Sequence, residues 1–297
     1  MGSFASVNGV ISPADEARVS ILDNGFTFGD AVYETLRTYA GRPFALARHL
    51  TRLRASAARL GISLPPSDAD LARTLDALLD RAGNAESFIR LIVTRGVGDI
   101  SYHFERVKGP TVVMAVKPFE GFPAAHYAEG VALALVSIRR NHRQALDPAI
   151  KSNNLLNNVL AVREAQARGA VEAILLNQEG HVAEGASTNV FLVKDGIAVT
   201  PPLHAGILQG ITREVVLELA REAGMAIREA TVPPEALREA DEIFITSSTR
   251  EVMPACLLDG RPVGSGRPGP VTQRLLEAFR AAIPRHCHPR GSFRESA

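Results

Sequence analysis

The stretch AVYETLRTYAGRPFALARHLTRLRASAARL, residues 31–60, decides the fold class because its hydrophobic period changes partway along. Residues 32–39 mix β-branched and aromatic side chains before Gly41-Arg42-Pro43, which predicts a strand that ends at a turn. Apolar side chains then recur every three or four residues, at Leu46, Leu50, Leu53, Ala57 and Leu60. This period predicts an amphipathic helix over 46–60.

The same two patterns continue along the rest of the chain. Further helices are predicted at 68–82, at about 154–168, and at 212–223 and 270–283. Further strands are predicted at 88–94, 111–117, 131–138, 173–176, 189–193, 197–200 and 242–246. Strands and helices are mixed without strict alternation, which favours an α+β fold over a doubly wound parallel sheet.

One segment interrupts these patterns. Residues 118–128 contain two prolines and a glycine and show no apolar period, which predicts an interdomain linker. We therefore expect an N-terminal α+β domain at 1–117 and a C-terminal α+β domain at 129–285. Residues 286–297 are expected to form a frayed tail.

Composition excludes several classes of protein. The 297 residues carry 33 basic and 32 acidic side chains, a net charge of +1, which argues against nucleic-acid or membrane-surface partners. Hydrophobic residues make up 46% and no apolar run approaches the roughly 18 residues that cross a bilayer. Two cysteines, Cys256 and Cys287, lack metal-ligand spacing, so we expect no metal and a reducing, cytoplasmic setting.

Lysines are rare in this chain and therefore informative. Only four of the 33 basic residues are lysines, so 33 − 4 = 29 are arginines. Lys108, Lys117 and Lys194 lie at predicted turns, whereas Lys151 lies where an apolar helix is about to begin. Partial desolvation there would free an amine for attack on a carbonyl, chemistry that arginine cannot perform. By position alone, however, an ordinary surface lysine is the simpler interpretation.

Four other features could bind anions or a cationic ring. Arg52 lies at the edge of the apolar stripe of its helix, where its head either reaches an anion or stays in water. The segment 210–214, GITRE, opens a helix and suits a phosphate, although Thr212 could simply cap that helix. The hydroxyl cluster 246–249 could add donors to the same phosphate. Glu184 lies among small residues, where its carboxylate could bind a cationic ring.

A globular binding protein without catalysis remains an alternative.

Six short motifs occur in a characteristic order. They are residues 29–34 (GDAVYE), 49–53 (HLTRL), 151–152 (KS), 184–189 (EGASTN), 208–213 (LQGITR) and 251–254 (EVMP). With these motifs the chain resembles the class IV aminotransferases over roughly residues 5–283. These fold-type IV pyridoxal-phosphate enzymes include branched-chain aminotransferases, D-amino acid transaminases and aminodeoxychorismate lyase.

The resemblance implies a homodimer of two-domain α+β subunits that binds pyridoxal 5′-phosphate. In it, Lys151 is the catalytic residue, which forms an imine with the cofactor and moves a proton between the substrate Cα and C4′. Glu184 pairs with the pyridine N–H, and Leu208 packs on the ring. The remaining cofactor contacts go to the phosphate, from Arg52, Gly210, Ile211, Thr212 and the hydroxyl of Ser248 or Thr249.

The resemblance leaves the substrate open. Branched-chain enzymes typically read Phe-Glu-Gly-x-Arg where residues 33–37 read YETLR, so Arg37 matches but Thr35 replaces glycine. Arg90 matches a branched-chain pocket arginine and is the candidate anchor for the substrate carboxylate. The expected substrate contacts are Tyr33, Thr35, Arg37, Arg90, Thr249 and Arg250.

The expected reaction is transfer of an amino group to a 2-oxo acid such as 2-oxoglutarate. The donor is a D-amino acid such as D-alanine, or a small or branched L-amino acid. Tyr33, and Leu155 four residues after Lys151, match the D-amino acid transaminases better than the branched-chain enzymes. The alternatives are a branched-chain L-amino acid aminotransferase proper and, because Thr35 is polar, an aminodeoxychorismate lyase.

Overall fold

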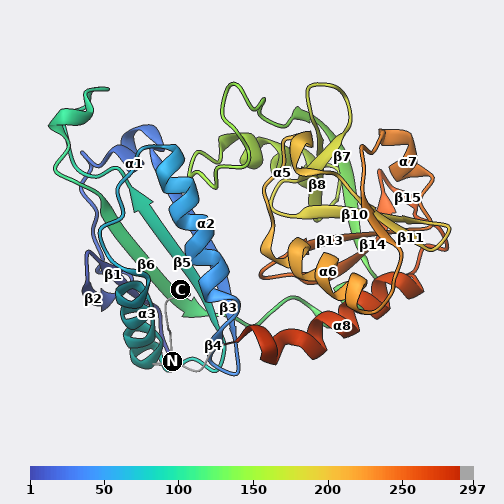
Figure 1. The fold of residues 1–297 in the computed structure, drawn as a ribbon, viewed down its shortest axis with the longest axis horizontal. Coiled ribbons are helices and arrows are strands. Elements are labelled where there is room, and N and C mark those ends of the chain that lie inside the picture. Colours follow the sequence, from blue (N-terminus) through green and yellow to red (C-terminus); the bar gives the residue numbers. More distant parts are fainter. Residues whose placement is uncertain (288–297) are drawn as a thin grey trace. The chain divides into compact units, whose positions relative to one another are not determined.

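A computed structural model describes residues 1–287 and divides into two compact units (Figure 1). The first unit comprises Met1–Glu120, Ile150–Asn154 and the chain from Ile283 onward. The second comprises Gly121–Ala149 and Leu155–Ala282. Both contain helices and a sheet, so the α+β class predicted from the sequence is confirmed.

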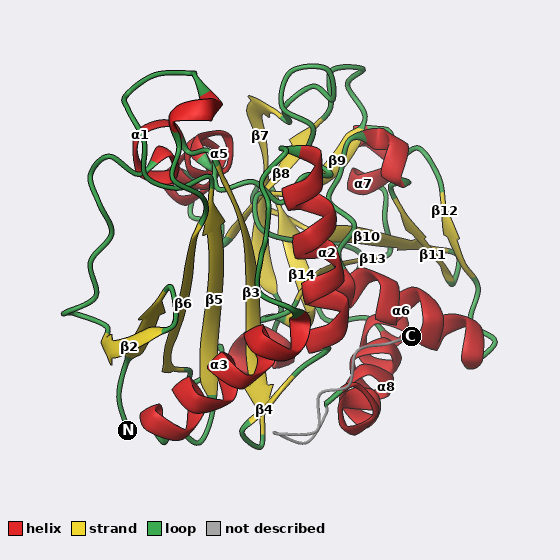
Figure 2. Cartoon of the chain, turned by 60° about the vertical axis from the view of Figure 1, so that its left-hand side comes forward, coloured by secondary structure: helices red, strands yellow, loops and turns green. Residues whose placement is uncertain are grey.

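The first unit is built on a six-stranded antiparallel sheet in the order β2-β1-β6-β5-β3-β4. Its strands are β1 (Phe4–Val7), β2 (Val10–Pro13), β3 (Ala31–Tyr39), β4 (Arg42–Pro43), β5 (Ser87–Thr94) and β6 (Thr111–Pro118). Its helices are α1 (Asn24–Phe28), α2 (Leu46–Arg59), α3 (Asp68–Ala82) and the 3₁₀ turn η1 (Phe104–Arg106). Figure 2 shows α2 and α3 lying across one face of this sheet.

Strand β3 separates two environments because successive side chains of a strand point to opposite faces. Val32 and Leu36 are buried in the core that α2 and α3 form with the sheet. Tyr33, Thr35 and Arg37 alternate with them and are only partly buried. Three of the expected substrate contacts therefore share one face of one strand.

The second unit is built on a nine-stranded sheet in the order β12-β11-β10-β13-β14-β7-β8-β9, with β15 paired to β14. Its strands are β7 (Val131–Arg139), β8 (Glu172–Leu176), β9 (Val182–Gly185), β10 (Asn189–Lys194), β11 (Ile197–Thr200), β12 (Ile227–Glu229), β13 (Glu242–Ser247), β14 (Glu251–Leu258) and β15 (Arg261–Pro262). Its helical segments are α4 (Ala124–Ala128), α5 (Leu156–Ala167), η2 (Leu203–Ala205), α6 (Ile211–Glu222), α7 (Pro234–Arg238) and most of α8 (Pro270–His286).

The unit boundary after Glu120 falls inside the segment 118–128 that the sequence marks as a linker. The lysine segment is placed differently from the expectation, which assigned Lys151 to a C-terminal domain spanning 129–285. Residues 150–154 belong to the first unit because they hydrogen-bond to β3. The amide of Tyr33 donates to the Lys151 carbonyl at 2.9 Å, and the amide of Asn153 donates to the Ala31 carbonyl at 2.7 Å. Hydrophobic period carries no information about such a long-range pairing.

The C-terminal boundary also differs from the expectation. His286 still belongs to α8, and its carbonyl accepts a hydrogen bond of 2.8 Å from the Ala45 amide. Cys287 forms a β-bridge with Phe44, so the predicted tail does not begin at residue 286. The rest of that tail, 288–297, lies outside the described residues. Among residues 1–287, no helix has the length and apolar character needed to span a membrane.

Candidate active site

Lys151 presents its amine to Tyr33. The Lys151 Nζ lies 4.5 Å from the centroid of the Tyr33 ring. Its backbone is fixed at both ends, because its amide donates to Ser56 Oγ at 3.2 Å and its carbonyl accepts from Tyr33. An amine on a fixed backbone beside an aromatic face is positioned for covalent chemistry at Nζ.

Arg90, on β5, contacts the same ring. Its Cζ lies 3.7 Å from the Tyr33 ring centroid, and its Nη1 donates to Thr35 Oγ1 at 3.0 Å. Its Nη2 donates more weakly to Asn153 Oδ1, at 3.4 Å. Three segments that are distant in sequence thus meet around Tyr33. Sequence reasoning missed Asn153, whose role depends on the pairing of residues 150–154 with β3.

The charge around Tyr33 is positive. Burial alone would raise the pKa of the phenol, but the neighbouring Lys151 and Arg90 outweigh it, so the pKa lies below its ordinary value. A field that favours a phenolate also favours any other anion placed on this face. The arrangement therefore suits a substrate that carries a carboxylate.

Arg37 lies two residues further along β3, on the same side as Thr35. Its Cζ lies 4.1 Å from the centroid of the Tyr39 ring and 4.8 Å from that of Phe119. Its Nε donates to the Thr38 carbonyl at 3.3 Å. Alternate residues of a strand are roughly 6.6 Å apart, so Arg37 extends the positive face beyond Arg90.

Arg52 reaches an anion, as the sequence suggested, but that anion belongs to the protein. Its Nε donates to Glu34 Oε1 at 2.8 Å and its Nη2 to Glu34 Oε2 at 2.7 Å. His49 Nδ1 lies 2.6 Å from the same Oε2, and both Glu34 and His49 are completely buried. Burial would raise the pKa of Glu34, but Arg52 and His49 hold it well below its usual range.

Sequence reasoning left the roles of Glu34 and His49 unassigned, although both stand in the quoted motifs. The only available signal was that Glu34 shares its side of β3 with apolar Val32 and Leu36. A carboxylate on the core side of a strand needs an internal partner, and α2 supplies two.

Glu184, in β9, is a buried carboxylate of the second unit. Its Oε1 accepts from Arg140 Nε at 2.8 Å. Its Oε2 accepts from the Leu208 amide at 3.0 Å and from Asn189 Nδ2 at 3.3 Å. Glu184 is only 4% exposed, so these donors hold its carboxylate in one orientation. No sequence pattern pointed to Arg140, which directly follows the last residue of β7.

The segment before α6 leaves hydrogen-bond donors unpaired at the start of a helix. Gly210 is the N-cap, with extended backbone angles of φ −76° and ψ 128° and no side-chain cap, so the alternative of a Thr212 cap is wrong. A Cβ on Gly210 would lie 1.8 Å from Asn189 Oδ1, so any other residue there would displace the Asn189 side chain. The amides of Ile211 and Thr212 belong to the first turn, where helices leave N–H groups unpaired. The buried Thr212 Oγ1 has no hydrogen-bond partner within residues 1–287.

The remaining candidate residues lie in the turn between β13 and β14. Ser248 and Thr249 are in this turn, and Thr249 Oγ1 lies 3.5 Å from Ser247 Oγ. The Arg250 Nη1 donates to Ser187 Oγ at 2.7 Å and lies 3.3 Å from the buried Glu172 carboxylate. The expected substrate contact Arg250 thus has an internal ion pair, which makes it a residue that holds the turn.

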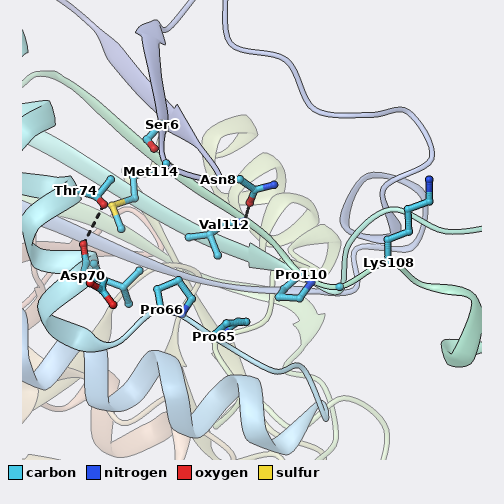
Figure 3. Close-up of a pocket in the computed structure, with 13 residues that line it drawn as sticks. Ser6, Asn8, Pro65, Pro66, Asp70, Thr74, Lys108, Pro110, Val112 and Met114 are labelled. Carbon is cyan, nitrogen blue, oxygen red and sulfur yellow. Dashed lines mark hydrogen bonds between the residues drawn. The ribbon is translucent and has the colours of Figure 1, made fainter.

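A separate cavity of about 580 Å³ occurs in the first unit (Figure 3). Pro66, Asp70 and Thr74 line one side of it, and Val112 and Met114 line another. None of the expected catalytic, cofactor or substrate residues is among the described residues that line this cavity.

The two groups of residues fit pyridoxal phosphate, each within its own unit. The first unit offers the Lys151 amine. The second offers an oriented carboxylate at Glu184 and a helix start with an unpartnered buried hydroxyl at Thr212. Helix starts of this kind bind phosphate groups.

Comparison with known proteins agrees with this chemistry. The family described as amino-transferase class IV matches residues 31–258. The D-alanine aminotransferase of Bacillus licheniformis is 39% identical over 93% of this chain and 95% of its own. A similar solved structure is that of the branched-chain aminotransferase of Thermoproteus uzoniensis with norvaline. Its sequence is 33% identical to this chain, and the two structures match with a TM-score of 0.88 over 95% of each chain.

A third similar protein has a cofactor derivative bound. It is the T.th. branched-chain amino acid aminotransferase complexed with N-(5′-phosphopyridoxyl)-L-glutamate, which is 31% identical. Its TM-score is 0.89, and the match covers 95% of this chain and 94% of that one. The chain described here belongs to the class IV aminotransferases, which use pyridoxal phosphate to transfer amino groups.

Proposed function

We propose that this aminotransferase moves the amino group of a small α-amino acid to a 2-oxo acid such as 2-oxoglutarate. D-alanine and small branched L-amino acids are the donors we expect, since the similar proteins include enzymes named for each class. The observation that carries this proposal is the contact of both Lys151 and Arg90 with the Tyr33 ring. A base and a carboxylate anchor on one ring are what an α-amino acid requires.

Pyridoxal phosphate, when bound, supplies an aldehyde that reacts with amines and a ring that accepts electrons from Cα. The Lys151 Nζ would bind that aldehyde until the substrate amine displaces it, and the freed amine would then take and return the substrate Cα proton. Arg90 orients the substrate by its carboxylate, and the Tyr33 ring contacts both cationic groups. Thr35 and Arg37 complete the substrate side of this face.

Glu184 accepts a hydrogen bond from the pyridine nitrogen and keeps that nitrogen protonated. The Arg140 and Leu208 contacts support this role because they fix the carboxylate before any ligand arrives. Leu208 itself packs on the ring face.

The phosphate is held by Arg52, by the amides of Ile211 and Thr212, and by the hydroxyl of Ser248 or Thr249. The unpartnered Thr212 Oγ1 supports this assignment. The Glu34 and His49 contacts fix the direction in which Arg52 can donate, so its guanidinium meets the phosphate with little loss of side-chain freedom. We do not propose the lyase activity, because the Thr35 hydroxyl that suggested it is engaged by Arg90.

We further propose a cytoplasmic homodimer. Leu156, Val159 and Leu160 of α5 are 65%, 57% and 42% exposed, and such an apolar strip is typical of a protein interface. Both cysteines are free, as expected in a reducing compartment. Light scattering should give about twice the chain mass of 31.8 kDa; a monomer at micromolar concentration would refute the dimer.

The proposal is tested by following the absorbance of the cofactor. The protein reconstituted with pyridoxal phosphate should lose its visible band when D-alanine or L-leucine is added, and 2-oxoglutarate should restore it. Borohydride reduction should attach the cofactor to the peptide that contains Lys151. Attachment to another lysine, or no bleaching with any D- or L-amino acid, would overturn the proposed function.

A further inference from the structure

Arg90 differs from three other buried or half-buried arginines of the chain, Arg52, Arg140 and Arg213. Arg52, Arg140 and Arg213 each form an ion pair with a glutamate. Arg90 is half-buried, yet within residues 1–287 it forms no ion pair. Its hydrogen-bond partners are a hydroxyl and an amide, and its stacking partner is a phenol ring. A half-buried guanidinium with only neutral partners still attracts an anion strongly.

Thr35 fixes the direction of this guanidinium. Thr35 and Arg90 are direct cross-strand partners in the antiparallel pairing of β3 with β5. Their side chains therefore lie on the same face, and Thr35 Oγ1 accepts from Arg90 Nη1 at 3.0 Å. The Tyr33 ring, 3.7 Å from the Arg90 Cζ, supports the guanidinium from a neighbouring position on the strand.

This contact depends on a residue that departs from the branched-chain pattern, which has glycine at position 35. Glycine has no hydroxyl and would leave Arg90 Nη1 without this acceptor. A long arginine side chain without a fixed partner samples many rotamers, and binding a substrate would then have to select one of them. Threonine removes that freedom before the substrate arrives.

We propose that Thr35 is a positioning residue that restricts the enzyme to donors carrying a carboxylate, by holding Arg90 beside Lys151. This inference rests on the proposed function, in which Arg90 is the carboxylate anchor. An amine that lacks a carboxylate would cover Arg90 with apolar atoms and leave it unpaired, which is unfavourable. Because Arg90 cannot easily turn away, α-amino acids are preferred over simple primary amines.

The experiment measures carboxylate binding separately from catalysis. The probe is 4-methylvalerate, a carboxylate without an amino group, titrated against the holoenzyme as a competitive inhibitor. In Thr35→Val the inhibition constant should rise about tenfold, the value for one lost hydrogen bond to a charged group. The KM for the amino donor should rise by a similar factor, with a smaller change in kcat. Thr35→Ser keeps the hydroxyl and should restore both values to within about threefold.

The matched control is Thr74→Val, which also removes a threonine hydroxyl from the first unit. Thr74 Oγ1 donates to the Asp70 carbonyl at 3.0 Å and lines the separate cavity (Figure 3). The control should bind 4-methylvalerate as the wild type does. If Thr35→Val does not fold, Thr35→Ala removes the same hydroxyl with less bulk and gives the same test.

The outcomes separate this inference from the proposed function. Unchanged inhibition in the Thr35 variants, or failure of Thr35→Ser to rescue, would overturn the positioning role while leaving the transaminase intact. No bleaching of the wild-type cofactor band by any amino acid would overturn the proposed function whatever the Thr35 variants do. A wild type that transaminates amino acids but does not bind 4-methylvalerate would also contradict the inference.

Discussion

The two faces of strand β3 differ in whether their charged side chains form ion pairs within the described residues. On the helix-covered face, Glu34 is completely buried and is neutralised by Arg52, with His49 as a second partner. On the other face, Lys151 and Arg90 surround Tyr33, and within residues 1–287 neither cation forms an ion pair. Adjacent residues of one strand thus belong to two different faces. On the closed face the charges are paired within the protein, and only Arg52 is also proposed to contact the phosphate; on the open face the cations are left for a ligand.

The largest expected effect comes from the open face. Lys151→Ala should lower the half-reaction rate with any amino donor by at least about a thousandfold, because no other group replaces the amine. The free energy of unfolding should change by less than about 0.5 kcal/mol, since this partly exposed amine makes no ion pair among the described residues. Stopped-flow absorbance and urea denaturation measure the two quantities.

Lys108→Ala is the matched control for that substitution. Lys108 is an exposed lysine at the rim of the separate cavity and should affect neither quantity. Residual turnover in Lys151→Ala at a tenth of the wild-type rate or more would remove the distinction between the two faces.

The closed face should respond in stability. Glu34→Gln leaves Arg52 without its carboxylate in a buried position, which typically costs about 3 kcal/mol. Urea denaturation at pH 7 should therefore show a clearly lower midpoint with an unchanged slope. Thr35→Gln, a substitution at the neighbouring residue on the partly exposed face, is the matched comparison and should cost less than about 1 kcal/mol. Equal losses in the two variants would show that the faces do not differ.

These two faces also show what sequence can and cannot determine. The change of period within residues 31–60 is sufficient to predict β3 and α2, and the motif order predicts that Lys151, Arg52 and Glu184 belong to one site. The sequence does not predict the partners of these residues. Asn153 and Arg140 reach their positions through strand pairings between segments far apart in sequence. Hydrophobic period reports burial of a segment but not the segment it pairs with.

His49 gives the closed face a pH dependence. Burial lowers the pKa of His49 despite the attraction of Glu34, because Arg52 already neutralises that carboxylate. The unfolded chain then binds a proton below about pH 6.5 that the folded chain does not, so stability falls as the pH drops. The fall should approach about 1.4 kcal/mol per pH unit between pH 6.5 and the lowered folded pKa.

The measurement compares the free energy of unfolding at pH 7.5 and pH 5.5. Glu34 does not contribute in this range, since its folded pKa is low and the unfolded carboxyl titrates only near pH 4.3. His49→Asn keeps a donor toward Glu34 but cannot titrate, so the pH dependence should be smaller in this variant. A wild-type stability that does not change, or one that rises, toward pH 5.5 would contradict the neutral, buried His49.

The smallest expected effect applies the same comparison to the second unit. Thr212 Oγ1 is buried without a partner within residues 1–287, which resembles the open face of β3 more than the closed one. Thr212→Val keeps the shape and removes the hydroxyl, so the apoprotein should be as stable as the wild type or slightly more so. Pyridoxal phosphate should bind about threefold to tenfold more weakly, because one donor to the phosphate is lost. Fluorescence titration of the apoprotein measures that affinity. If Thr212→Val is less stable but binds the cofactor as tightly as the wild type, the hydroxyl stabilises the fold and does not bind the phosphate.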